Sequence, residues 1–525
     1  MPVRRVDRLV LAAAFLALGL VCYAHTYLAS RTIEGTRYFW LDDDMMISMR
    51  YARNLAEGQG LAWNAGDRVE GYTNFLWTLV MAAVHLTGVA DARAAVLVRI
   101  VNFVFLAGCF ALSLRLLRVF APRSRIAAPL LVLTMFMCPD VILWSAWGFE
   151  TSLLTFLSLL FFVRVLSRGR DPLGFLALGL IPLTRGDGLY LFAAHALVAL
   201  LVTPGRRETM KWLAIALVPA ALHLVFRRAY YGDWLPNTYY LKVYGVEALN
   251  ARGFAYGRAF VFDHAVLLVL AGGSALAILR SDLRGVVLWV MVPAALAYVL
   301  LTGGDMFGFF RFFAHVMPLV FVFATVGLVT IARGMLGRVV WASVLLLVSV
   351  PLVNPLNRLL FNATNGDPER QLRVAMIMKK HALPQSVVAV YCAGIVPYFT
   401  RLPAIDLLGK SDRHIAHMQA FPGAMLGHGK VDPDYSLGQN PDLVVTCSTN
   451  HGMATGFVLG QPRSTDPMKV ILGADSFRTR YMPSPVLESY LLDQTAVYTY
   501  PGSAEYPRRD WESLTPSSPQ GPTAP

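Results

Sequence analysis

The feature that most constrains the fold of this chain is a succession of long apolar segments separated by short basic clusters. The first segment, residues 9–30, follows the basic stretch MPVRRVDR. Only 15% of the 525 residues are charged, compared with roughly 25% in soluble domains. A run of about 20 apolar residues is long enough to cross a bilayer as a helix. The sequence therefore predicts a polytopic α-helical membrane protein.

The apolar segments give roughly eleven predicted spans, counted at about 20 residues per helix. They are residues 9–30, 96–117, 126–143, 150–166, 172–184, 189–203, 211–226, 263–279, 284–302, 314–332 and 338–353. We interpret the first as an uncleaved signal anchor with a cytoplasmic N-terminus. Basic clusters such as GRRETMK (205–211) lie between spans, which is typical of loops at an anionic cytoplasmic surface. The formal charge of +13 thus indicates membrane lipids as partners, and no nucleic acid.

One apolar segment does not fit this topology. NFLWTLVMAAVHLTGV (74–89) has only 16 residues, which is short for a span. If it is an interfacial or re-entrant helix, the arginines between residues 115 and 125 return to the cytoplasmic side, as the positive-inside rule requires. Residues 31–95 then form a first loop on the extracytoplasmic side.

The composition changes after the predicted membrane domain, residues 1–354. Residues 355–510 alternate apolar stretches with turns that contain Gly and Pro, which predicts an extracytoplasmic α/β domain. Residues 511–525 are predicted to be a disordered tail. Cys392 and Cys447 fall on strand-like segments of the outer domain. A disulfide and two buried free thiols both remain open.

Three consecutive aspartates, Asp42 to Asp44, follow the first span closely. If residues 43–55 are helical, Asp43 shares one face with Ile47, Arg50 and Asn54. The opposite face carries Met45, Met49, Ala52 and Leu55, which would suit the membrane interface. Asp42 can cap the helix, but a cap requires only one side chain. The other two acids are therefore candidates for function.

The charges that this topology leaves outside form four groups near the ends of spans, where charged residues usually face a cavity or a partner. The groups are the aspartates with Glu70; Glu150 with Arg185 and Asp187; Arg227 and Arg228 with Lys242; and Asp305 with Arg311. We expect them to line one polar cavity. Arg227 and Arg228 could instead anchor a helix at headgroups, and Glu150 could be a simple interfacial residue. For His414 and His417, spaced as HxxH, we favour surface or acceptor contacts over a metal.

The stretch LDDDMMISMRYARNLAEGQGLAWNAGDRVEGYTNFLW resembles the first outer loop of membrane glycosyltransferases with the GT-C fold. It is most similar to the mycobacterial terminal arabinofuranosyltransferase family, which uses decaprenyl-phosphate arabinofuranose. The matching positions include Asp43, Asp44, Ser48, Arg50, Tyr51, Asn54, Glu70 and Asn74. Later stretches, YYGDWLPNTYYLK, GGDMFGFFRFF and DLLGKSDRHIAH, are similar as well. The chain departs from the family pattern at Asp42 and Met45.

The resemblance implies a GT-C fold and transfer of a pentose from a polyprenyl-phosphate donor to an envelope glycan. Asp43 would be the base and Asp44 would orient it or the acceptor, with a divalent cation as an open alternative and no other cofactor implied. The donor-binding candidates are Arg50, Arg227, Arg228, Tyr239, Lys242, Asp305 and Arg311. The acceptor or cavity candidates are Asn54, Glu70, Asn74, Glu150, Arg185, Asp187, His414 and His417.

Two rival functions remain at this point. An enzyme of the same fold could glycosylate a protein such as a pilin, or use another polyprenyl-phosphate sugar. A non-enzymatic polysaccharide transporter would need charges near the bilayer midplane, whereas the predicted spans are nearly free of charge. We therefore expect an inner-membrane enzyme whose active site is extracytoplasmic.

Overall fold

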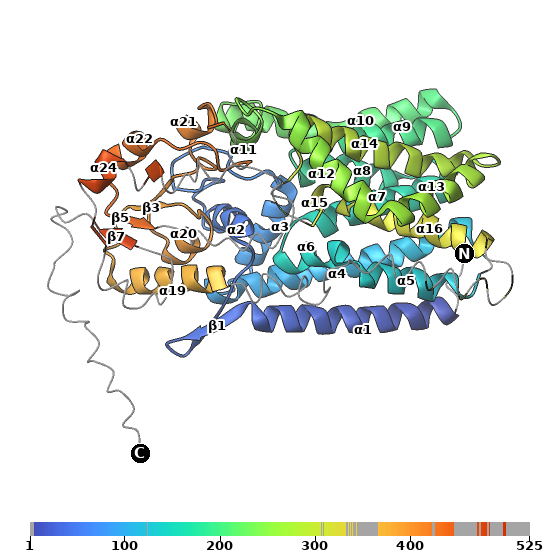
Figure 1. Cartoon of the computed structure of the whole chain (residues 1–525), viewed down its shortest axis with the longest axis horizontal. Helices are drawn as coiled ribbons and strands as arrows, with labels where there is room; N and C mark the ends of the chain where they lie inside the picture. Colours follow the sequence, from blue (N-terminus) through green and yellow to red (C-terminus); the bar gives the residue numbers. More distant parts are fainter. Residues whose placement is uncertain are drawn as a thin grey trace, which may run out of the picture.

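The computed structural model describes residues 5–331 except 123, 306 and 308, isolated positions from 334 to 343, residues 366–445 except 423–425, and short pieces between 470 and 499. The molecule is elongated, with a bundle of helices at one end and a small sheet at the other (Figure 1). Helix α1 (Arg5–Leu28) runs along one side of the bundle.

Five helices are long and apolar enough to cross a membrane. They are α1, α4 (Asp91–Phe120), α7 (Thr151–Arg168), α10 (Arg206–Tyr231) and the continuous stretch Leu283–Thr302, which comprises the 3-10 helix η1 (Leu283–Gly285) and α14 (Val286–Thr302). Shorter apolar helices are α8 (Pro172–Thr184), α9 (Gly188–Val202) and α16 (Met317–Ile331).

Two further pairs of helices are apolar enough together but bent at a break, as in a broken span or a re-entrant loop, and counting each pair as one span gives up to seven candidate spans in the described part of the chain. Helix α5 (Ala127–Met137) meets α6 (Pro139–Trp147) at 56°, and α12 (Leu249–Asp263) meets α13 (Ala265–Leu279) at 79°. The predicted span 338–353 lies almost wholly outside the described residues. The count of eleven spans therefore stays a prediction.

Helix α3 (Phe75–Leu86) occupies the short apolar segment. Its 12 residues give a length of about 18 Å, against a hydrocarbon core of about 30 Å. It packs beside α2 (Asp43–Ala56). The helix is thus too short to span on its own, while its depth in the membrane stays a prediction.

Helix α2 is buried on both sides, which corrects the expected position of its apolar face. Met45, Met49 and Ala52 were expected in the membrane interface, but they are buried. The reason is that two helices pack against α2. One is α3, and the other is the short helix α20 (Ile395–Thr400), which is more than 300 residues further along the chain. An apolar stripe covered in this way belongs to the protein core.

The sheet at the far end has the strand order β4-β3-β5-β7-β6. Strands β3 (Val388–Val390), β4 (Ala404–Asp406) and β5 (Leu443–Val445) are parallel. All their residues are buried and all but Asp406 are apolar, which suits a sheet covered on both faces. Strand β7 (Val497–Thr499) is antiparallel to β5 and to β6 (Met482–Pro483).

The remaining elements lie in the loops, in the bundle and around the sheet. They are the hairpin β1 (Ser30–Ile33) and β2 (Thr36–Phe39), α11 (Asn237–Lys242), α15 (Arg311–Ala314), α19 (Gly366–His381), α21 (Arg413–Ala416), α22 (Pro433–Gly438) and α24 (Asp475–Arg478). Cys392, which follows β3, is disulfide-bonded, so it is not a free thiol. Cys447 lies outside the described residues.

Candidate active site

The three aspartates lie at the N-terminus of α2 and have three different environments. Asp42 is the N-cap, and its Oδ1 accepts a hydrogen bond of 3.1 Å from the backbone N–H of Asp44. The capping role considered for Asp42 is therefore confirmed. Asp43 and Asp44 are both partly exposed, and both contact residues of the domain that contains the sheet.

Asp43 is anchored through one carboxylate oxygen. Its Oδ1 accepts hydrogen bonds from the backbone N–H groups of Gly394 (3.2 Å) and Ile395 (2.9 Å), at the start of α20. Its Oδ2 accepts none from the residues that the structure describes. Burial raises the pKa of Asp43 to about 6, although Lys410 opposes the shift. Asp43 is thus a fixed carboxylate with one free oxygen and a pKa near neutrality, which suits a general base.

Asp44 pairs with Lys410, which follows β4 in the sheet domain. Burial disfavours the ionised form of Asp44, but the charges of Lys410, Lys242 and Arg311 outweigh it and lower the pKa of this carboxyl. Asp44 therefore stays charged while Asp43 titrates. The ammonium of Lys410 provides one positive charge beside Asp44, while a divalent cation at the aspartates stays a prediction.

Lys242 and Arg311 bring two more cations to the aspartates. Lys242, at the end of α11, is half-buried and makes no hydrogen bond or ion pair within the described part of the chain. Arg311 is buried, with Nε 2.7 Å from Oδ2 of Asp305 and Nη2 3.1 Å from Oδ1. Its guanidinium carbon lies 4.8 Å from the ring centre of Phe149 and 5.1 Å from that of Phe307. This aromatic enclosure fixes the direction of the Arg311 charge.

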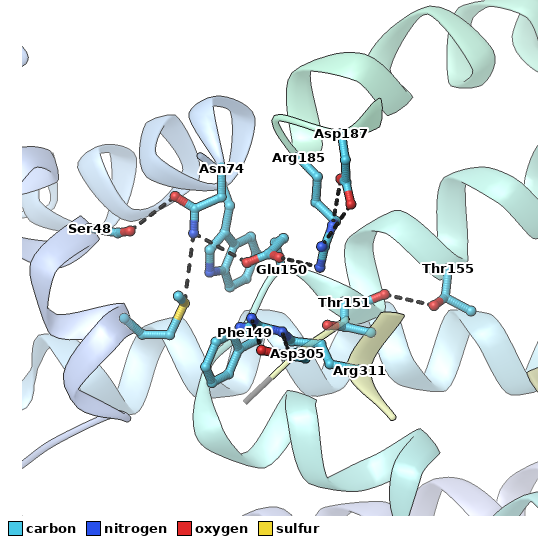
Figure 2. Close-up of polar contacts among 12 residues, drawn as sticks. Ser48, Asn74, Phe149, Glu150, Thr151, Thr155, Arg185, Asp187, Asp305 and Arg311 are labelled. Atoms are coloured by element: carbon cyan, nitrogen blue, oxygen red, sulfur yellow. Dashed lines mark hydrogen bonds and ion pairs between the residues drawn. The ribbon is translucent and has the colours of Figure 1, made fainter. Parts of the chain in front are cut away.

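A chain of polar contacts runs from Ser48 of α2 into the helical bundle (Figure 2). Arg185 makes a bidentate pair with Asp187, at 2.8 and 2.9 Å, and donates to Glu150 at 3.2 Å. Glu150 accepts from Asn74 at 3.3 Å, and Asn74 accepts from Ser48 of α2 at 3.0 Å. Four residues predicted for the cavity are therefore in contact. They join the first loop to the starts of α7 and α9, which fixes α2 against the bundle.

Arg50 is buried and its guanidinium is bonded to groups of the chain itself, so its role in binding the donor phosphate stays a prediction. Its guanidinium donates to the carbonyls of Trp63 (2.6 Å), Pro397 (2.7 Å) and Leu402 (2.9 Å) and to Asn64 Oδ1 (2.9 Å). These contacts occupy four of its five N–H donors.

Asn54 was predicted to reach the acceptor or the cavity, but it is buried within the first loop. Its amide nitrogen donates to the carbonyls of Ala62 and Trp63, at 2.8 and 3.1 Å. The sequence does not show that Asn54 and Arg50 bond to the chain itself. The carbonyls that accept their hydrogen bonds come from the folded first loop and, for Arg50, also from α20.

Glu70 and Arg227, predicted for different ligands, bind each other. Arg227 Nε lies 2.5 Å from Oε2 of Glu70 and Nη2 lies 3.1 Å from Oε1, and both side chains are buried. Arg228 is exposed and donates to the carbonyl of Gly232 at the end of α10, as a helix anchor would. Tyr239 is exposed. Among the predicted donor-binding residues, Lys242 and Arg311 are the ones whose charges act on Asp44, and Asp305 pairs with Arg311.

His414 and His417 are both exposed, and each stacks on a tyrosine. His414 Nε2 lies 2.9 Å from Asp432, whereas His417 Nδ1 lies 2.8 Å from the carbonyl of Arg413. Among the described residues, one group of side chains elsewhere in the molecule is close enough to share a metal ion, and neither histidine belongs to it.

Lys410 is the site residue that sequence reasoning missed. It lies in the stretch DLLGKSDRHIAH, where the histidines drew attention because of their spacing. Its position near the end of a buried parallel strand was a usable signal, because functional side chains gather at such strand ends. Its pairing with a residue 366 positions away could not be predicted without the fold.

Comparison with known proteins identifies the class of fold. The structure superposes on ArnT from Cupriavidus metallidurans bound to undecaprenyl phosphate with a TM-score of 0.57 and 12% identity, covering 95% of this chain and 99% of that one. It also resembles the arabinofuranosyltransferase AftD from mycobacteria, with a TM-score of 0.50 and 13% identity, covering 93% and 40%. The chain therefore has the fold of GT-C membrane glycosyltransferases, as the first loop predicted.

Within that class, the curated sequence relatives are terminal β-(1→2)-arabinofuranosyltransferases, which confirms the resemblance seen in the loop. The relative from Mycobacterium tuberculosis is 29% identical over 38% of this chain, and the one from Corynebacterium glutamicum is 28% identical over 51%. The matched part spans 34% and 45% of those two proteins. Residues 363–500 also match a family described as a domain of unknown function, DUF8728.

Proposed function

We propose that this chain is a membrane glycosyltransferase that transfers arabinofuranose from a polyprenyl-phosphate donor to an extracytoplasmic envelope glycan. The observation that carries the proposal is the pair of aspartates at the start of α2, with one carboxylate oxygen free and three cations around them. The names of the sequence relatives support the sugar. The undecaprenyl phosphate bound to ArnT, which has the same fold, supports the class of donor.

In the proposed reaction, Asp43 is the base. Its free Oδ2 takes the proton of the acceptor hydroxyl. At the same time the oxygen of that hydroxyl forms a bond to the anomeric carbon of the donor sugar. The two backbone N–H groups at Oδ1 hold the carboxylate in place during this step. Lys410 keeps Asp44 ionised and partly offsets the effect of burial on Asp43. It also supplies the positive charge that a divalent cation would otherwise bring.

The bond between the anomeric carbon and the phosphate oxygen breaks in the same reaction, and the phosphate leaves with the electron pair. The phosphate gains one negative charge, so cations directed at it stabilise the transition state more than the bound donor. Lys242 is the first candidate because it makes no ion pair among the described residues. Arg311, enclosed by aromatic rings, is the second, with Asp305 holding its orientation.

The rival function that keeps the same site is glycosylation of a protein. Nothing in the contacts around Asp43 separates a glycan hydroxyl from a serine or threonine hydroxyl, because both present one O–H to the same base. The two acceptors differ only in what surrounds that hydroxyl.

Mass spectrometry of a deletion strain tests the proposal and separates the acceptors. We expect envelope glycans that lack terminal arabinofuranose, with restoration by the wild-type gene and not by Asp43→Asn. Intact glycans together with a protein that has lost a pentose would favour the protein acceptor. Intact glycans and intact proteins would refute transfer by this chain.

A further inference from the structure

The two breaks in the bent helix pairs place three potential metal ligands together, none of them among the residues of the candidate active site. Cys138 is the residue between α5 and α6, and His264 is the residue between α12 and α13. Asp140 follows Cys138 by two positions. The Sγ atom of Cys138, a carboxylate oxygen of Asp140 and a ring nitrogen of His264 all lie within 4.8 Å of one another. All three residues are buried.

The protonation of His264 argues for a cation between these side chains. Its Nδ1 lies 3.1 Å from the carbonyl oxygen of Phe260, and because a carbonyl can only accept, Nδ1 carries the proton. In a neutral ring, Nε2 then presents a lone pair. Nε2 lies 3.6 Å from Oδ2 of Asp140, another electron-rich atom. A metal ion bound between the three side chains would accept this lone pair together with the carboxylate oxygen and the sulfur, which all lie within 4.8 Å of one another.

We propose that Cys138, Asp140 and His264 bind one zinc ion. Thiolate, imidazole and carboxylate are the ligands that zinc prefers. Ligand atoms around a tetrahedral zinc lie roughly 3.3–3.8 Å apart, and the contact between Asp140 and His264 is 3.6 Å. A divalent ion held by one thiolate and one carboxylate is neutral overall, as burial among apolar groups requires. The hydrogen bond from Nδ1 to a backbone carbonyl is the outer contact that metal-bound histidines usually make.

The zinc ion would hold in place the loop that presents Arg311. Trp144, on the helix that begins after Cys138, donates from Nε1 to the carbonyl of Phe309 at 3.1 Å. The ring of His264 contacts the ring of Phe310 edge-on, with 5.6 Å between centres. Phe310 has a φ of 41°, a left-handed conformation that is strained for a bulky residue. Fixing both helix breaks would therefore support the strained residue directly before Arg311.

Metal analysis of the full-length protein tests the proposal without reference to transferase activity. The protein is purified in detergent on a matrix free of metal, and zinc is measured by mass spectrometry of the elements. We expect about one zinc per chain, and after chelation we expect rebinding of zinc or of cobalt(II). Cobalt bound by Cys138 should give a thiolate charge-transfer band in the near ultraviolet.

Variants assign the ligands. Cys138→Ala, Asp140→Asn and His264→Gln should each lower zinc affinity by more than about tenfold, and Cys138→Ala should abolish the cobalt–thiolate band. Cys109→Ala is the matched control, because Cys109 is also buried and its thiol donates to the carbonyl of Ser152. If the ligand variants fail to fold, the wild-type cobalt spectrum decides. Wild-type protein that holds no zinc and gives no cobalt band would overturn the proposal and leave an imidazolium–carboxylate pair.

Discussion

Replacement of Lys410 by methionine should shift the pH dependence of transfer, because Lys410 acts on the base through its charge. Methionine retains the length and apolar stem of lysine and removes only the ammonium. In the wild-type protein burial raises the pKa of Asp43 to about 6, and Lys410 is the largest influence in the opposite direction. Without that ammonium, Asp44 also loses its partner and repels charge on Asp43 more strongly. Both changes raise the pKa of Asp43.

The size of the effect follows from the usual influence of one neighbouring charge. An opposite charge at contact distance lowers a carboxyl pKa by about 1–3 units, and at the partly exposed Asp43 we expect the lower half of that range, so that its pKa rises to ~7–8. The fraction of Asp43 ready to accept a proton at pH 7 then falls from about 90% to ~10–50%. Turnover at pH 7 should drop roughly two- to tenfold and recover toward wild-type by about pH 9.

The assay is the pH profile of kcat/KM for the purified protein with a short-chain donor. The acid limb should lie near pH 6 in the wild-type protein and should move to higher pH in Lys410→Met. Lys410→Arg keeps the charge and should keep the profile. Lys379→Met, which changes an exposed lysine on α19, is the control. An equal loss at every pH, with no movement of the acid limb, would refute the electrostatic role and leave Lys410 as a structural contact.

Three further results are expected. Arg311→Lys should keep a positive charge but lose the paired contact with Asp305, so donor KM should rise and turnover should be only partly retained; unchanged kinetics would make Arg311 an anchor. Gly394→Ala should lower the apparent melting temperature and the activity, because a Cβ there would lie 2.0 Å from the carbonyl oxygen of Asp43, and such overpacking costs about 1–3 kcal/mol. Gly438→Ala, where a Cβ meets nothing within 4 Å, is its control, and equal melting temperatures would contradict the close contact. Reporters fused after residues 90 and 205 should report the outer side and the cytoplasm respectively, and a cytoplasmic signal after residue 90 would make 74–89 a true span.

The local structure of the first loop could be predicted from the sequence because it depends on neighbouring residues. The helix predicted for 43–55 is α2, Asp43–Ala56, and Asp42 caps it. Capping and helical periodicity act over three or four positions, so one stretch of sequence contains the whole signal. The same local reasoning identified the helix at 75–86 as too short to span.

The partners of the charged residues could not be predicted, because they come from distant parts of the chain. Arg50 is separated by 347 positions from one of its acceptors, Pro397. Glu70 and Arg227 are 157 positions apart. An arginine near a membrane surface looks the same in a sequence whether it binds a lipid phosphate or a buried carboxylate. Only the fold distinguishes them.

The two breaks near Cys138 and His264 show a further limit of sequence reasoning. The sequence predicted a continuous span at 126–143, where the structure bends by 56°; the predicted span 263–279 coincides with α13, and the 79° bend lies at its start. Pro139 gives a reason for the first break, since proline cannot continue a helix without losing a hydrogen bond. The second break has no proline, and at this position the ring of His264 contacts those of Phe260 and Phe310.

The most direct test of the central claim is sugar transfer by the purified full-length chain from a synthetic short-chain polyprenyl-phosphate arabinofuranose to an arabinan acceptor. We expect transfer by the wild-type protein, and at least ~100-fold slower transfer by Asp43→Asn, the usual scale for loss of a general base. Donor affinity should not change. Asp42→Asn is the matched control, since asparagine caps a helix as well as aspartate does, and its rate should stay near wild-type. Transfer by Asp43→Asn at the wild-type rate would contradict the account.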